Sequence, residues 1–286
     1  MANQAWRKPE WLRKKIVPSR LREIEAILEK GKLHTVCQEA MCPNISKCFS
    51  ARQATFMILG NICTRGCTFC AVGRGETRLP DPLEPFHVAE TVRELGLRHV
   101  VITSVTRDDL SDGGAEHFVR TVREIKRMDE GIVVELLIPD MRACEVSLAQ
   151  VAASGAEIIA HNVETVPRLY HVRKGSDYRR SLGVIKKVGE LNPHVSTKSA
   201  LMLGLGEHEE EVLEVMGELL EAGCRYLSIG QYLSPSSHHA PVIEYVAPER
   251  FDYFARWGRE MGYAHIQSSP YTRSSYKAHE YRGERT

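Results

Sequence analysis

Hydrophobic and polar positions follow two alternating patterns along most of the chain. Short apolar runs predict buried β-strands, and longer stretches with apolar residues three and four positions apart predict amphipathic helices. The predicted strands are residues 54–59, 99–105, 132–138, 157–160, 197–203 and 226–231. The predicted helices between them are residues 88–95, 114–128, 145–153, 178–190 and 209–222.

This succession of elements indicates an α/β fold. Strands that alternate with helices pair in parallel, because a parallel neighbour needs a crossover connection. We therefore expect a partial (β/α)6 barrel of the TIM type over residues 53–247, an N-terminal extension of residues 1–52, and a C-terminal helix and tail over residues 248–286. Catalytic residues of such barrels lie where the strands end, so the expected site is at that edge.

Composition and charge exclude some classes of protein. The chain has 286 residues with 43% hydrophobic content, which suffices for a substantial core. A net charge of +1 argues against a nucleic-acid-binding protein. We expect no membrane segment and no signal peptide, so the cysteines should lie in a reducing, cytoplasmic compartment.

The most informative motif is a triplet of cysteines directly after the first predicted strand. Cys63, Cys67 and Cys70 are separated by three and then two residues. Three thiolates on one loop can hold three corners of an iron–sulfur cube and leave one iron open for another ligand. A zinc site usually adds a second cysteine pair or nearby histidines, and a disulfide does not suit a reducing compartment, so both alternatives are weaker.

A second trio precedes the barrel. Cys37, Cys42 and Cys48 are separated by four and five residues, which again suggests a cluster that lacks one cysteine ligand. A zinc site completed by His34 or another histidine is the alternative. Two clusters in one chain would have different tasks.

These motifs resemble those of the lipoyl synthases, a family of radical S-adenosylmethionine (SAM) enzymes, over nearly the whole chain. The resemblance is carried by both cysteine trios and by five further segments. These are residues 105–115 (VTRDDLSDGGA), 161–165 (HNVET), 198–207 (KSALMLGLGE), 230–235 (GQYLSP) and 273–276 (RSSY).

The resemblance implies a radical SAM barrel and a sulfurtransferase activity. A lipoyl synthase inserts two sulfur atoms at carbons 6 and 8 of an octanoyl group that is bound to a lipoyl carrier domain, either in a 2-oxoacid dehydrogenase complex or in the glycine cleavage H-protein. It uses two 4Fe–4S clusters and SAM, and the auxiliary cluster donates the sulfur. A flavodoxin or ferredoxin supplies electrons. Those C–H bonds are not acidic, so a radical cofactor is required.

The resemblance also implies roles for individual residues. Cys63, Cys67 and Cys70 would hold the cluster that binds SAM. Cys37, Cys42 and Cys48 would hold the auxiliary cluster, with Ser275 as its fourth ligand and Ser274 as the alternative. The residues expected to contact SAM are Asn162, Glu164, Arg179 and Lys198. Residues 108–114 have no assigned role beyond acidic residues near a helix start.

Two details differ from the family pattern, and two other functions compete. Lys277 stands where a histidine is common, and Ala200 where a glycine is common; neither is an expected cluster ligand. A methylthiotransferase would need a C-terminal RNA-binding domain, which a short tail does not supply. The non-enzymatic alternative is a zinc-stabilised module that binds an acidic partner through its basic N-terminal arm, residues 1–36, where nine Lys and Arg face four Glu.

Overall fold

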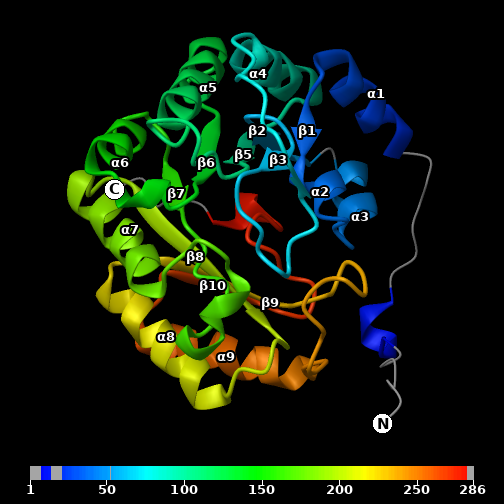
Figure 1. Cartoon of the computed structure of the whole chain (residues 1–286), viewed down its shortest axis with the longest axis vertical. Helices are drawn as coiled ribbons and strands as arrows, with labels where there is room; N and C mark the ends of the chain where they lie inside the picture. The colour runs from blue at the N-terminus through cyan, green and yellow to red at the C-terminus, as the bar shows by residue number, and fades with distance from the viewer. Residues whose placement is uncertain (1–7, 14–20, 52, 282–286) are drawn as a thin grey trace.

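The computed structural model describes residues 8–13, 21–51 and 53–281. An eight-stranded sheet in the order β1-β2-β5-β6-β7-β8-β9-β10 forms an open barrel with helices on its outside (Figure 1). The strands from β2 to β10 are parallel, and only the edge strand β1 (His34–Thr35) is antiparallel. The parallel strands are β2 (Thr55–Ile58), β5 (His99–Ser104), β6 (Val133–Leu137), β7 (Ile158–Ala160), β8 (Ser196–Leu203), β9 (Tyr226–Gln231) and β10 (His265–Ser268).

Six helices cover the outer face of the sheet (Figure 1). Each packs an apolar stripe on the strands; in α5, for example, Phe118, Val122 and Ile125 are fully buried at helical spacing. Asp177 begins α7 by accepting a hydrogen bond from the Arg180 N–H. The helices are α4 (Glu84–Leu95), α5 (Ala115–Met128), α6 (Glu145–Ala152), α7 (Tyr178–Leu191), α8 (Glu209–Glu221) and α9 (Pro248–Met261). All five helices predicted from the pattern are confirmed within a few residues.

The sheet has one more parallel strand than the sequence predicts. The strand β10 follows α9 and pairs with β9, within the segment predicted as a C-terminal helix and tail. Its residues His265, Ile266, Gln267 and Ser268 are mostly polar, and only Ile266 is buried. An edge strand of this kind has no apolar run, so the hydrophobic pattern does not reveal it.

Residues 21–51 of the N-terminal extension lie beside the β2 edge of the barrel, whereas residues 10–12 lie apart from them (Figure 1). The elements of the extension are the short 3-10 helix η1 (Glu10–Leu12), α1 (Leu21–Gly31), β1, α2 (Val36–Glu39) and α3 (Ile45–Ser50). The helix α1 packs on α4 and α3. Much of the predicted basic arm, including Arg7, Lys14, Lys15 and Arg20, lies outside the described residues.

Side chains of alternate strand residues point into the barrel, as the pleat requires. Near the end of the barrel where the parallel strands begin, the Nζ of Lys198 lies 2.8 Å from a carboxylate oxygen of Glu135, and both side chains are fully buried. The 3-10 helix η4 (Ala278–Glu280) and Tyr281 enter the same space, where the ring of Tyr281 lies 3.7 Å from Nζ of Lys198. The C-terminal segment thus runs through the middle of the ring of strands, as the red trace in Figure 1 shows.

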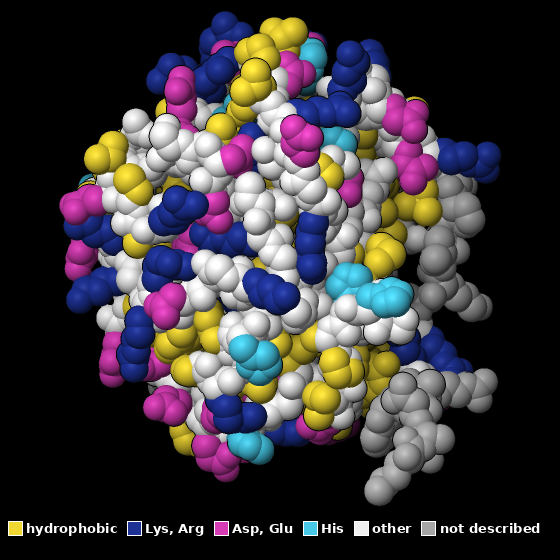
Figure 2. Space-filling model, in the orientation of Figure 1, with side chains coloured by type: hydrophobic (Ala, Val, Ile, Leu, Met, Phe, Trp, Pro, Cys, Tyr) yellow, Lys and Arg dark blue, Asp and Glu magenta, His cyan; other side chains and the backbone are white. Residues whose placement is uncertain are grey.

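The face seen in Figure 1 carries charged side chains of both signs, spread without a large patch of either (Figure 2). This agrees with the small net charge of +1. No helix in the described part of the chain is both long enough and apolar enough to cross a membrane.

Candidate active site: two cysteine trios and one cavity

The cysteine triplet lies on the loop that leaves β2, together with the two-residue strands β3 (Ile62–Cys63) and β4 (Gly73–Arg74). This loop is held by backbone bonds to distant segments, since the Thr68 N–H donates to the Val172 carbonyl at 2.8 Å. The imidazole Nε2 of His239 lies 3.1 Å from the Cys70 carbonyl oxygen, to which it donates. The loop is therefore fixed by the rest of the barrel and not by its own short strands.

The second trio is arranged by two short helices. Cys37 lies in α2, Cys48 lies in α3, and Cys42 lies in the turn between them. The hydroxyl of Thr35 accepts a bond from the backbone N–H of Gln38 and so begins α2. The Cys42 N–H donates to the Cys37 carbonyl at 3.0 Å, which closes the turn.

The thiols have the properties of potential metal ligands. None of the six forms a disulfide within the described part of the chain. Burial raises the pKa of the Cys37 thiol to about 12, with a further contribution from the nearby Cys42 thiol. Burial also raises the pKa of the Cys70 thiol to about 11. These thiols are protonated at neutral pH, and a metal would displace the protons on binding.

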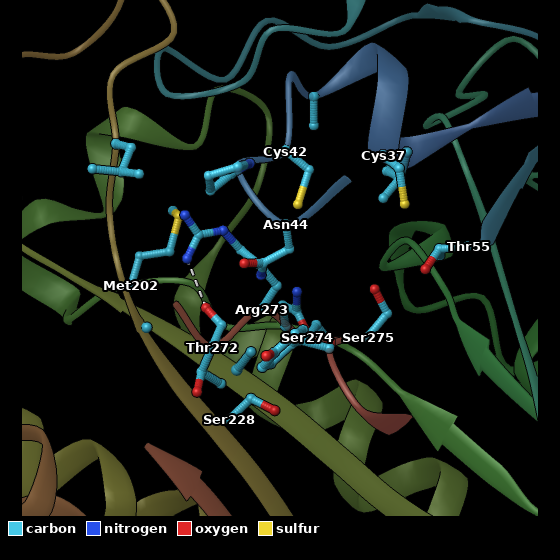
Figure 3. Close-up of a pocket in the computed structure, with 18 of the residues that line it drawn as sticks. Cys37, Cys42, Asn44, Thr55, Met202, Ser228, Thr272, Arg273, Ser274 and Ser275 are labelled. Atoms are coloured by element: carbon cyan, nitrogen blue, oxygen red, sulfur yellow. Dashed lines mark hydrogen bonds between the residues drawn. The ribbon is translucent and has the colours of Figure 1, made fainter. Parts of the chain in front are cut away.

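The RSSY segment lies opposite the second trio. It is tied to the N-terminal extension, because the Asn44 side-chain amide donates to the Tyr271 carbonyl at 2.7 Å and Lys47 Nζ donates to the Tyr276 hydroxyl at 3.0 Å. Figure 3 shows the hydroxyl of Ser275 pointing toward the space between the sulfur atoms of Cys37 and Cys42. The structure thus brings together residues that are more than 200 positions apart in the sequence.

The two serines of this segment point in different directions. The Ser274 hydroxyl donates to the side-chain oxygen of Asn162 at 3.0 Å. Arg273 is half-buried, desolvation lowers its pKa, and its guanidinium donates to the Thr272 carbonyl at 2.7 Å (Figure 3). Ser274 is therefore engaged on the barrel side, whereas Ser275 faces the cysteines.

One cavity of about 450 Å³ joins these groups inside the barrel. Its wall contains members of both cysteine loops, the RSSY segment and inward-facing strand residues. The polar or sulfur-bearing residues in this wall include Cys37, Cys42, Cys48, Cys70, Asn162, Glu164, Arg273, Ser274 and Ser275. Apolar side chains cover much of the rest, among them Val36, Met41, Phe69, Val101, Leu137, Leu201, Met202 and Leu233.

Asn162 and Glu164 lie at the carboxyl end of β7, as the sequence predicts, and they face this cavity. The Asn162 side-chain amide donates to the Glu164 carboxylate at 3.0 Å. Burial raises the pKa of the Glu164 carboxyl, while the nearby guanidinium of Arg173 acts in the opposite direction. Glu164 also has a left-handed backbone with a φ of 68°, which a non-glycine residue rarely adopts. A strained, half-buried carboxylate in a cavity wall is typical of a binding site.

Arg173 is a site residue that the sequence analysis missed. Its Nη1 donates to the carbonyl of Asn162 at 2.8 Å and bonds the Tyr170 hydroxyl, and its buried Nε has no partner within the described residues. It lies directly behind the Asn162–Glu164 pair. Its position in the irregular segment after η3 (Pro167–Val172) offers no periodic pattern that would have indicated this role.

Two expected SAM contacts do not lie in the cavity. The side chain of Arg179 is 78% exposed on the outside of α7 and pairs with Glu218 of α8 at 2.9 Å. Lys198 is the third residue of β8, so it lies at the start of the strand and not at its end, and Glu135 neutralises it. Neither residue belongs to the cavity wall, which argues against both as SAM contacts. The linear pattern does not show which way a helical side chain points or which buried partner a strand residue meets.

The residues that the structure describes contain no group of three His, Cys, Asp or Glu side chains placed for a single metal ion. The chemistry of the cavity wall nevertheless fits a cluster, because three thiols belong to it and the Ser275 hydroxyl points toward the space between two of them (Figure 3). Next to Cys70, Asn162 and Glu164 supply oxygen and nitrogen atoms suited to a polar cosubstrate.

Comparison with solved structures agrees with the barrel. The chain resembles SuiB of Streptococcus suis bound to S-adenosylmethionine, with a TM-score of 0.59 and 12% identity over 79% of this chain and 53% of that one. It also resembles methylornithine synthase, with a TM-score of 0.55 and 13% identity over 79% of this chain and 76% of that one. At such low identity these similarities show the fold alone.

Comparison of sequences shows the family. The model of the radical SAM superfamily matches residues 57–230. The lipoyl synthase of Geobacter metallireducens is 56% identical over 97% of this chain and 98% of its own length. The lipoyl synthase of Geobacter sulfurreducens is 57% identical over 97% of this chain and 91% of its own length. That of Caldanaerobacter subterraneus is 53% identical over 95% and 96%. The resemblance seen in the motifs is therefore confirmed, and the chain belongs to the lipoyl synthase family of the radical SAM superfamily.

Proposed function

We propose that this protein inserts two sulfur atoms, at carbons 6 and 8, into an octanoyl group carried by a lipoyl domain, and that both steps occur in the cavity of about 450 Å³. The observation that carries the proposal is the joint lining of that cavity. Cys70, Asn162 and Glu164 lie on one part of its wall, and Cys37, Cys42, Cys48 and Ser275 lie on another. An alkyl chain inside it would contact both sets.

Cys63, Cys67 and Cys70 are the proposed ligands of the cluster that binds SAM. When bound, this cluster and SAM supply the radical that removes hydrogen from unactivated carbon. Asn162 and Glu164 orient SAM beside Cys70 through their amide and carboxylate groups. Arg173 positions this pair by holding the Asn162 carbonyl, and its charge offsets that of Glu164.

Cys37, Cys42 and Cys48 are the proposed thiolate ligands of the auxiliary cluster, which supplies the sulfur. Ser275 is the proposed fourth ligand, because its hydroxyl faces the cysteines whereas Ser274 bonds Asn162. A serine oxygen is a harder ligand than a thiolate and matches iron in such a cluster less well. A weaker bond at this position suits a cluster that must give up sulfur.

The apolar wall of the cavity holds the octanoyl chain and excludes water from it. Met202, Leu233 and Phe69 contribute to this wall next to the two cysteine sites. Water exclusion matters, because a reactive radical must meet only the intended C–H bond. The carrier is a lipoyl domain of a 2-oxoacid dehydrogenase complex or the glycine cleavage H-protein, and the electron donor is of the flavodoxin or ferredoxin type. The expected location is the cytoplasm.

The test is mass spectrometry of an octanoylated lipoyl domain after anaerobic incubation with the reconstituted protein, SAM and dithionite. The expected result is a gain of two sulfur atoms with loss of hydrogen. Ser275→Ala should abolish this product while SAM is still cleaved to 5'-deoxyadenosine. Ser274→Ala is the matched control and should retain sulfur insertion.

The outcomes separate the parts of the proposal. An unchanged carrier mass with the parent protein, despite SAM cleavage, would rule out the octanoyl substrate but keep the radical chemistry. Full activity of Ser275→Ala together with loss in Ser274→Ala would reverse the assignment of the serine ligand. An intact SAM pool in a protein that holds both clusters would overturn the whole function.

A further inference from the structure

Residues 105–115 carry one of the family motifs, and the proposed function assigns them no role. They follow β5 and lead into α5. Part of the motif shapes this turn, because the Asp112 carboxylate accepts bonds from the Gly114 N–H at 2.9 Å and the Glu116 N–H at 2.8 Å. The rest of its polar groups point the other way, toward the cysteine loop.

The motif bonds the backbone of the cysteine loop directly. The N–H and the hydroxyl of Thr64 both donate to the Thr106 carbonyl, at 3.0 and 2.9 Å. The same hydroxyl accepts a bond from the Asp108 N–H at 3.0 Å. Thr64 is the residue after Cys63, so the first cysteine of the loop is fixed against the end of β5.

Arg65, between Cys63 and Cys67, is held by two carboxylates. Its Nε and Nη2 donate to the two oxygens of Asp108 at 2.7 and 2.8 Å. Its Nη1 and Nη2 donate to the two oxygens of Asp140 at 2.9 and 2.8 Å. Asp140, which is 1% exposed, follows β6 and also accepts from Arg180 of α7 at 2.8 Å. Bidentate pairing of this kind fixes a guanidinium in orientation as well as in position.

The surroundings are shaped to admit the Arg65 side chain. Gly175 has a φ of 78°, and a Cβ at that position would lie 3.2 Å from Cδ of Arg65. The Ser176 hydroxyl accepts a further bond from Nη1 of Arg65 at 3.2 Å. Segments after β5, β6 and η3 thus converge on a single side chain of the cysteine loop.

The same motif also holds the two ends of the loop. Arg107 donates to the Leu59 carbonyl at 3.2 Å, where the chain leaves β2, and to the Arg78 carbonyl at 2.8 Å, before α4. Asp109 accepts from Arg107 at 2.7 Å and from the Thr77 hydroxyl at 2.9 Å. The motif therefore contacts the loop at its beginning, near its first two cysteines and at its end.

We propose that Arg65 is a positioning residue for Cys63, Cys67 and Cys70, and that Asp108 and Asp140 are its anchors. The inference rests on the proposed assignment of these cysteines to the SAM-binding cluster. A loop with so little regular structure does not by itself fix three thiolates at the corners of a cluster. Groups that orient ligands from behind typically change metal affinity about 10- to 100-fold when they are removed.

The experiment measures how fast iron leaves this site. The parent is the full chain with Cys37, Cys42 and Cys48 replaced by alanine, so that only the SAM-binding cluster remains. After anaerobic reconstitution, iron release to an excess of a ferrous chelator is followed by absorbance. Arg65→Lys keeps the positive charge but loses the planar guanidinium that pairs with two carboxylates at once. Asp108→Asn keeps the shape of the side chain but loses its negative charge. Arg98→Gln, in an ion pair whose arginine is 82% exposed, is the matched control.

We expect iron release to be about 10-fold faster in Arg65→Lys and in Asp108→Asn than in the parent, and unchanged in Arg98→Gln. Thermal unfolding of the metal-free proteins should differ little among all four. Parent-like iron release in Arg65→Lys would overturn the proposal. A loss of metal-free stability that accounts for the faster release would also overturn it, because Arg65 would then serve the fold in general. A parent that takes up no iron would refute the cluster assignment itself, which is a distinguishable failure.

Discussion

Gly230 offers the sharpest test of how the RSSY segment is placed. It is the fifth residue of β9, between β8 and the edge strand β10, and the chain at Thr272 crosses directly over it. A Cβ at position 230 would lie 2.0 Å from the Thr272 carbonyl oxygen and 2.9 Å from its carbon. Both atoms belong to the backbone, so no side chain can rotate away.

The size of the effect follows from this geometry. The Thr272 carbonyl must retreat by about 1.4 Å to reach ordinary van der Waals distance from an alanine methyl group. Overpacking of this kind typically costs about 1–3 kcal/mol of folding free energy. Ser275 is three residues further along, and ligand distances at metal sites tolerate only about 0.2 Å. We therefore expect Gly230→Ala to lose the auxiliary cluster.

The assay counts iron per chain after reconstitution, together with SAM cleavage and sulfur insertion. Iron should fall to about half of the parent value, because one of two equal clusters is lost. Sulfur insertion should disappear while SAM cleavage persists, since the cysteine loop is anchored elsewhere, for example by Arg65. Gly217→Ala in α8 is the control, because a Cβ added there would meet no atom of the described residues within 4 Å outside its own helix backbone. It should leave all three values unchanged and stabilise the helix by about 0.5–1 kcal/mol.

Full iron content and normal sulfur insertion in Gly230→Ala would refute the reasoning. That result would mean that the RSSY segment can move without consequence, or that it does not hold a cluster. Loss of both clusters and of SAM cleavage would also contradict it, because the damage would then not be confined to this segment.

Three further predictions concern residues that the structure reassigns or buries. Arg179→Gln should leave SAM cleavage within about twofold of the parent, because an exposed ion pair contributes little. Lys198→Met should lower the free energy of unfolding in urea by about 3–5 kcal/mol, because the buried Glu135 loses its lysine counter-ion and keeps only the contact with Nε2 of His99 at 3.3 Å. Burial and the charge of Arg173 lower the pKa of His161 to about 4 in the folded state. Its folded pKa is below its unfolded value, so it contributes stability above about pH 6.5 that is lost as the pH falls toward 4. The loss is about 3 kcal/mol, measured by urea unfolding across this range with His161→Asn for comparison.

Each of these has a result that would contradict it. A tenfold loss of SAM cleavage in Arg179→Gln would return that residue to the site. Unchanged stability in Lys198→Met would mean that Glu135 takes up a proton at little cost. An identical pH dependence in the parent and in His161→Asn would show that other groups dominate acid unfolding.

The cysteine site shows which features of a site a short sequence pattern can predict and which it cannot. Cys63, Cys67 and Cys70 are neighbours in sequence, so their spacing alone indicates a shared ligand. Arg65 lies in the same motif, yet its proposed role depends on Asp108 and Asp140, which follow two other strands, β5 and β6. No feature of residues 63–70 reveals those partners, because a long-range ion pair has no periodicity.

The residues expected to contact SAM show that a polar residue in a motif does not always lie in the cavity. Asn162 and Glu164 line the cavity, as expected for residues that follow a parallel strand, because the carboxyl ends of such strands lie on one edge. Their contact with SAM stays a prediction. Lys198 belongs to an equally polar motif, but it lies two residues into β8 and so at the far end of the barrel. The hydrophobic pattern already places Lys198 near the start of its predicted strand, residues 197–203, whereas the expected SAM contact came from the resemblance. Only the structure shows that Lys198 pairs with the buried Glu135.

The sequence by itself determined the parallel α/β architecture, the two cysteine trios and the family. These are local properties, because apolar periodicity and motif spacing depend only on residues that are close together in the sequence. Tertiary structure decided which serine faces the second trio, that Arg179 lies outside the site, and that Thr272 crosses Gly230 near the carboxyl end of β9. These features depend on how distant segments pack together. The contacts that stabilise this packing join residues far apart in the sequence, so no short stretch of the chain predicts them.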